Sequence, residues 1–104
     1  MNKIRLVINN EVQKKNKEKF FIKKELQSIL NLYAKMVSNG SWKDYSFTSG
    51  FREVSFNVYQ RASDKPVLRI LKNLKPHYFS ERYLIKDKNG IILKKSEDLN
   101  QLIN

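Results

Sequence analysis

Side chains that could perform acid–base chemistry are few and are scattered along the chain. The single histidine, His77, lies between Pro76 and Tyr78 in a stretch typical of a loop. A hydrolase would need a carboxylate pair, or a carboxylate beside a histidine, held together by the fold. No spacing places two acids on one strand face among Glu53, Asp64, Asp87, Glu97 and Asp98. We therefore expect no catalytic residues and no enzyme activity, with a hydrolase kept as a minor alternative.

Signals for metal and cofactor sites are missing as well. The chain has no cysteine, which excludes disulfides, thiolate ligands and cysteine nucleophiles. One histidine does not make a typical zinc site. The only glycines are Gly40, Gly50 and Gly90, and they form neither a dinucleotide-binding motif nor a phosphate loop. We expect no cofactor and no metal.

Positive charge is the strongest feature of the composition. The chain has 21 Lys and Arg against 10 Asp and Glu, which gives a net charge of +11 and a pI near 10.0. Such a charge favours RNA, another polyanion or an acidic protein as partner. The alternative is compositional drift, because an AT-rich genome also produces abundant Lys, Asn and Ile with few alanines. No apolar run approaches the roughly 20 residues of a membrane span, so we expect a cytoplasmic protein without a membrane partner.

One amphipathic helix, residues 20–40, is the element on which the rest of the chain is expected to pack. Its apolar face has helical spacing and is formed by Ile22, Leu26, Ile29, Tyr33 and Met36. Leu30 and Val37 widen this face. The dipeptide Asn39-Gly40 is typical of the C-terminal end of a helix.

Alternating apolar residues after the helix predict an antiparallel meander. The expected strands cover residues 41–48, 53–60, 67–72, 82–87 and 91–94. Asn89-Gly90 predicts a type I′ turn, and Ser96 is expected to cap a final short helix packed down by Leu99, Leu102 and Ile103. The fold is therefore α+β with two layers: a long N-terminal helix on a four- to five-stranded sheet, and a short C-terminal helix. Trp42 is expected in the core.

The N-terminal region differs from this domain in composition. Apolar and polar residues alternate over residues 3–9, as in a short strand. Residues 13–19 form a basic polar run that has no apolar side chains to bury. We assign residues 1–19 to a basic arm and residues 20–104 to a single domain.

The sheet face turned away from the helix is the candidate binding surface. It is expected to be polar and open, with Tyr59 as one aromatic ring among cations. Sheet-based RNA readers stack bases on rings and hold phosphates with cations. The alternative is a plain solvated face. Together with the arm and the start of the helix, the predicted nucleic-acid-binding residues are Lys14, Lys15, Lys23, Lys24, Tyr59, Arg61, Arg69 and Lys86.

Several segments resemble a small alphaproteobacterial family of unknown function. They are residues 25–30 and 42–45, then 56–63 with Pro66, Arg69 and Ile70, and finally 90–94. The likeness covers roughly residues 21–103. The chain departs from the family pattern at Ile22, where Asp is expected as helix N-cap, and at residues 95–97. The resemblance implies an intracellular bacterial protein and carries no activity.

The function that these observations favour is non-enzymatic binding of nucleic acid, RNA rather than duplex DNA, since the one long helix is committed to the core. A protein-interaction or regulatory module without catalytic activity is the alternative. It is suggested by uncovered sheet edges near residues 45–48 or Lys94.

Overall fold

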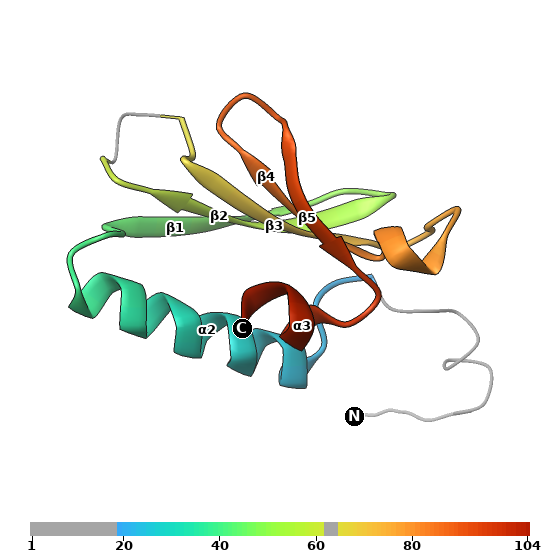
Figure 1. The fold of residues 1–104 in the computed structure, drawn as a ribbon, viewed down its shortest axis with the longest axis horizontal. Coiled ribbons are helices and arrows are strands. Elements are labelled where there is room, and N and C mark those ends of the chain that lie inside the picture. Colours follow the sequence, from blue (N-terminus) through green and yellow to red (C-terminus); the bar gives the residue numbers. More distant parts are fainter. Residues whose placement is uncertain (1–18, 62–64) are drawn as a thin grey trace, which may run out of the picture.

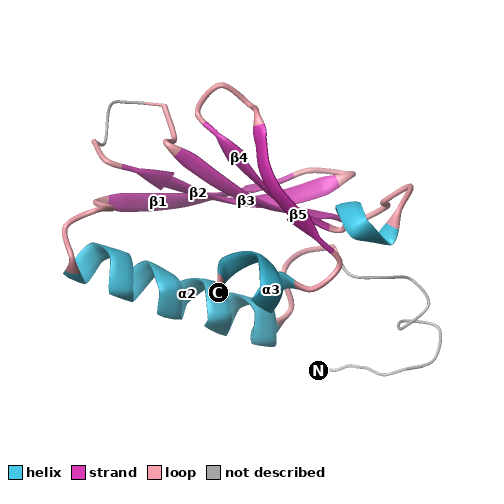
Figure 2. Cartoon of the chain, in the orientation of Figure 1, coloured by secondary structure: helices cyan, strands magenta, loops and turns pink. Residues whose placement is uncertain are grey.

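The computed structural model describes residues 19–61 and 65–104, and it shows a helix layer packed on one side of a sheet (Figures 1 and 2). The expected strand over residues 3–9, and the basic run as far as residue 18, lie outside the described residues. The elements are α2 (Lys23–Ser38), β1 (Asp44–Ser49), β2 (Glu53–Tyr59), β3 (Leu68–Asn73), the 3-10 turn η1 (Phe79–Glu81), β4 (Tyr83–Asp87), β5 (Ile92–Ser96) and α3 (Leu99–Ile103). The α+β fold is confirmed.

The sheet is an antiparallel meander in the order β1-β2-β3-β4-β5, as the short connections predicted. Phe56 of β2 lies opposite Ile70 of β3, which lies opposite Ile85 of β4. These side chains point toward α2 and are buried. Trp42, in the link before β1, is 6% exposed and belongs to the same core, which confirms its predicted position.

Helix α2 is shorter than expected, and its buried stripe is narrower. Ile29 is fully buried, and Leu26, Tyr33 and Met36 pack partly against the core. The prediction was wrong for Ile22, which is the exposed N-cap residue before the helix. It was also wrong for the two residues expected to widen the stripe, since Leu30 and Val37 are each 40% exposed. The sheet covers only one narrow side of the helix.

The predicted turn and cap near the C-terminus are also corrected. The Gly90 N–H donates to the Asp87 carbonyl (3.0 Å), so the central residues of the turn are Lys88 and Asn89, and Gly90 follows them at φ 82°. This is a type I turn followed by a left-handed residue rather than type I′. The N-cap of α3 is Asp98, whose carboxylate accepts from the Asn100 N–H (3.0 Å), not Ser96. Leu99 and Leu102 are buried as predicted.

Candidate functional site

A buried polar cluster joins the start of α2 to the middle of the sheet. One carboxylate oxygen of Glu25 accepts from the Lys72 ammonium and from the Ile22 N–H, each at 2.8 Å. The other oxygen accepts from the Tyr83 hydroxyl. Lys72 also donates to the Phe20 carbonyl (3.2 Å). Glu25, Lys72 and Tyr83 are 7%, 1% and 6% exposed, so this is an ion pair held within the core.

Strand periodicity places two of these residues on the core side of the sheet. Lys72 follows Ile70 by two positions in β3, and it pairs directly with Tyr83 of β4. Glu25 stands one helical turn before Ile29 and so faces the same way. None of the three was predicted from the sequence, because Lys and Glu are usually exposed and a lone Tyr gives no sign of a buried partner. The available signal was the alternation Leu68, Ile70, Lys72, which continues the inward face.

The electrostatics of the cluster keep its phenol protonated. Burial above all, together with the hydrogen bond to Glu25 and the negative charge of that carboxylate, raises the pKa of Tyr83 to about 12. The buried carboxylate is compensated by the Lys72 ammonium. Glu25 also supplies one half of a capping box, because its carboxylate accepts from the N–H of the N-cap residue Ile22, which itself makes no side-chain cap hydrogen bond. The arrangement therefore fixes the N-terminus of α2 on β3 and β4.

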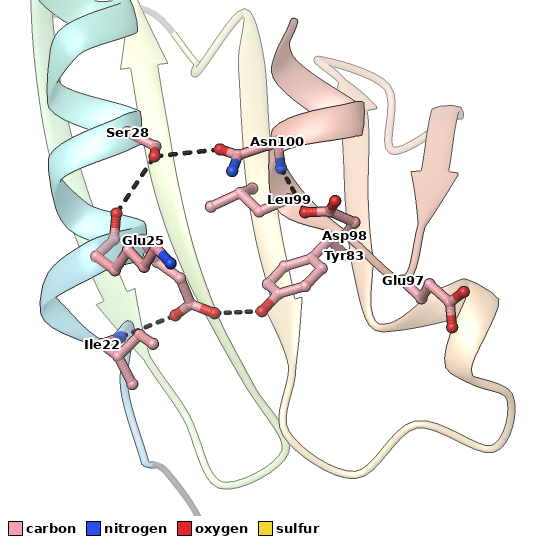
Figure 3. Close-up of a pocket in the computed structure, with 9 residues that line it drawn as sticks. Ile22, Glu25, Ser28, Tyr83, Glu97, Asp98, Leu99 and Asn100 are labelled. Carbon is pink, nitrogen blue, oxygen red and sulfur yellow. Dashed lines mark hydrogen bonds between the residues drawn. The ribbon is translucent and has the colours of Figure 1, made fainter.

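A cavity of about 230 Å³ opens beside this cluster, between α2 and the segment leading into α3 (Figure 3). The acidic side chains at its rim do not converge. Asp98 is engaged as the cap of α3, and Glu97 points away from the Glu25 carboxylate. His77 is exposed in the β3–β4 loop, as expected. Among residues 19–61 and 65–104, no three His, Asp or Glu residues are grouped to hold a metal ion.

The sheet face away from α2 is less open than predicted. Ser55 and Asn57 lie on it, but they are only 5% and 4% exposed. Asn57 accepts from the Ser55 hydroxyl (2.9 Å), and its amide donates to Ser46 (3.2 Å) and Thr48 (2.9 Å). The Tyr59 hydroxyl shares a 3.0 Å hydrogen bond with Ser46, and its ring is half-buried. These polar groups satisfy one another, which leaves little of this centre for a ligand.

Some of the predicted binding residues gather at one end of this face. Arg69 pairs with Asn57 on one side and with Lys86 on the other, so both cations share the face with Tyr59. Arg61 follows β2 at the same end and is exposed. Lys23 and Lys24 are exposed in the first turn of α2, in the other layer, and do not join this group. Lys14 and Lys15 lie outside the described residues.

The structure adds three cations to this end of the sheet, Lys43, Lys65 and Lys88. We call this end the cationic end, and its members are Lys43, Arg61, Lys65, Arg69, Lys86 and Lys88. A groove of about 380 Å³ separates the β2–β3 connection from the β4–β5 turn, lined by Gln60, Lys65, Val67, Lys88 and Asn89. None of the six cations forms an ion pair with another residue of the described ranges. Two nearby acids of the described ranges accept backbone hydrogen bonds: Asp87 accepts from two N–H groups of the β4–β5 turn, and Asp44, the first residue of β1, accepts from one. Asp64 lies outside the described residues.

The domain described above also matches a known protein family. A family model matches residues 19–103. The chain belongs to the family described as "Protein of unknown function (DUF2794)". The suspected membership of an uncharacterised family is thus confirmed, while the bacterial origin stays an expectation. In this DUF2794 chain, residue 22 is the helix N-cap, the role that the resemblance implied for this position.

No curated protein and no solved structure matches the chain. None of the helices in the described part of the DUF2794 chain has both the length and the apolar character to cross a membrane. The description of the family names no ligand and no reaction.

Proposed function

We propose that this protein binds single-stranded nucleic acid, RNA in particular, through its sugar–phosphate backbone and without catalysing a reaction. The supporting observation is the cationic end, where Lys and Arg side chains from several loops and strands surround a groove. Within the described ranges these cations form no ion pair, so they are available to attract phosphates and to release the counterions condensed on the strand.

Two features favour a single strand of RNA over duplex DNA. The apolar side of α2 is packed against the sheet, so this side of the helix cannot enter a DNA major groove. Gln60 and Asn89 line the groove with amide groups that hydrogen-bond to a ribose 2′-hydroxyl. The ring of Tyr59 is half-buried, so we expect phosphate contacts to dominate and sequence preference to be weak.

The test is fluorescence anisotropy with a labelled RNA of about 12 nucleotides, a typical site size for such surfaces. Binding is expected to weaken as salt rises, with a log–log slope of about −0.7 per neutralised phosphate. The double variant Arg69→Gln/Lys86→Gln should lower affinity about tenfold and reduce the slope by about 1.4, because two phosphate contacts are lost.

A matched control separates a binding site from general charge. The double variant Arg52→Gln/Lys75→Gln removes the same charge from exposed positions in the β1–β2 turn and after β3, at the other end of the sheet. It should bind RNA nearly as well as the native chain. If both double variants weaken binding equally, or if the affinity is insensitive to salt, the cationic end is not a nucleic-acid site.

A further inference from the structure

The two edges of the sheet differ in how they are protected. At one edge, the pairing of β5 with β4 shifts between Ile85 and Lys86, and the strand carries Lys94 and Lys95. Bulges and lysines are the usual devices that prevent an edge strand from pairing with another chain. At the other edge, β1 pairs with β2 without a register shift from Asp44 to Ser49 and contains no Lys, Arg or Pro.

The outer backbone groups of β1 have no strand partner within residues 19–61 and 65–104. The Gly50 N–H donates to the Glu53 carbonyl (2.9 Å), and backbone groups alternate in direction along an antiparallel ladder. Tyr45, Phe47 and Ser49 therefore direct their N–H and C=O groups outward. In agreement, the Tyr45 N–H donates to the Asp44 carboxylate (2.8 Å) rather than to β2.

An apolar strip on α2 runs beneath this open edge. The rings of Tyr33 and Tyr45 lie 4.8 Å apart, which places that side of the helix under β1. Leu30 and Val37 stand three before and four after Tyr33, on the same side. The opposite side of the helix faces α3, since Ser28 hydrogen-bonds to Asn100 (3.2 Å). Leu30, Val37 and Tyr45 are each 40–41% exposed, so the open edge is bordered by large apolar side chains.

We infer that β1 and this strip form the interface of a two-fold symmetric dimer, in which β1 of one protomer pairs antiparallel with β1 of its partner. Pairing centred on Ser46 places Tyr45 opposite the partner's Phe47 and Asp44 opposite the partner's Thr48. The five strands of each protomer then form one continuous sheet.

A second copy suits this surface better than an acidic peptide does. Lys43 is the one cation next to the paired span, and it lies opposite the partner's Ser49. The surface therefore offers aromatic and aliphatic groups that match their own symmetry mates, and little charge to attract acids. Because both the strand and the helix contribute, the contact extends over both layers of the fold.

The first test is analytical ultracentrifugation of the nuclease-treated full chain. Tyr45→Lys and Leu30→Lys place a charge at the proposed contact and should each weaken dimerisation at least tenfold. Ile92→Lys is the matched control, since Ile92 is 50% exposed on the opposite edge of the sheet, and it should leave dimerisation unchanged. Circular dichroism of each variant confirms that it remains folded.

The second test uses the absence of cysteine from the native chain. In Ser46→Cys the two thiols face each other across the symmetry axis, within the reach of a disulfide. In Thr48→Cys the two thiols lie several residues apart along the paired strands. Both native hydroxyls accept from Asn57, so the substitutions disturb the same local network. Oxidation should cross-link the first variant and not the second.

Three results would overturn the inference. The native chain could sediment as a monomer at about 100 µM, which corresponds to a weak interaction. Ile92→Lys could be the variant that dissociates the dimer, which would move the interface to β5. Finally, a monomer with slow amide exchange at Tyr45 and Phe47 would show that the chain's own residues 3–9 occupy the edge.

Discussion

The buried ion pair between Glu25 and Lys72 gives a sharp test of how the two layers are held together. Glu25→Gln keeps the size of the side chain but removes its charge, so the Lys72 ammonium, 1% exposed, stays in the core without the carboxylate. Removing one partner of a buried pair costs about 3–5 kcal/mol. This is a large share of the roughly 5–15 kcal/mol that stabilises a domain.

The reverse substitution should cost less. In Lys72→Met the Glu25 carboxylate stays buried, but it still accepts from the Ile22 N–H and the Tyr83 hydroxyl. Hydrogen bonds to a charged group contribute about 1.5–3 kcal/mol each, so part of the compensation survives. We expect a loss of about 2–4 kcal/mol, at or below that of Glu25→Gln.

The double variant Glu25→Gln/Lys72→Met carries no buried charge in the cluster. Its loss of stability should therefore be smaller than the sum of the two single losses by at least about 2 kcal/mol, which is the coupling of two groups in contact. Urea unfolding measures these free energies, and the single Trp42, 6% exposed in the core, provides the fluorescence signal.

Salt offers an independent check of the same reasoning. A pair at this depth is poorly screened, so about 1 M NaCl should change the coupling little. Additive single losses, or a coupling that disappears in salt, would mean that the two charges are hydrated and that the described contact does not stabilise the fold.

Two further predictions concern the same region. Tyr83→Phe should lose about 1.5–3 kcal/mol at neutral pH, because a hydrogen bond to the Glu25 carboxylate is removed. The pKa of Tyr83 is raised from 10.0 to about 12, so its contribution is complete below pH 10 and falls as pH rises from 10 to 12, by up to about 3 kcal/mol. The difference in urea stability between native chain and variant should shrink over that range, and a constant difference would refute the shift. Ile22→Asp should stabilise the chain by about 1 kcal/mol, because the N-cap residue is extended and makes no side-chain cap hydrogen bond. An unchanged melting temperature would show that Glu25 already supplies the available capping.

Periodic segments of the sequence were predictable because their pattern has one physical meaning. Val54, Phe56 and Val58 alternate with polar residues, and all three are fully buried against α2. Ile29 was equally clear at the centre of the helix stripe. The Asn89-Gly90 turn was misassigned because the same dipeptide serves two turn types, and the Asp87 carboxylate decides between them by accepting from the Asn89 and Ile91 N–H groups.

Residues in the cluster around Glu25 were not predictable, because composition alone does not reveal a buried charge. Lys72 reads as a surface lysine until its partner is known, and that partner is 47 positions away in the sequence. The cationic end has the same origin: Arg61 and Lys65 come from the β2–β3 connection and Lys88 from the β4–β5 turn, and the meander brings these two loops to one end of the sheet. Local patterns carry no information on such long-range pairings.

Leu30 and Val37 connect the misjudged width of the helix stripe with the proposed dimer. Their spacing predicted burial, yet each is 40% exposed, because the sheet ends at β1 and covers no more of the helix. In an antiparallel pairing of β1, the Lys43 end of one protomer lies beside the Ser49 end of its partner. The two cationic ends are then diagonal to each other, which limits the repulsion between chains that each carry a net charge of +11. Because β1 lies away from the groove between the β2–β3 connection and the β4–β5 turn, Leu30→Lys should weaken dimerisation at least tenfold without weakening RNA binding by the isolated protomer. A loss of both together would show that the groove is complete only in the dimer.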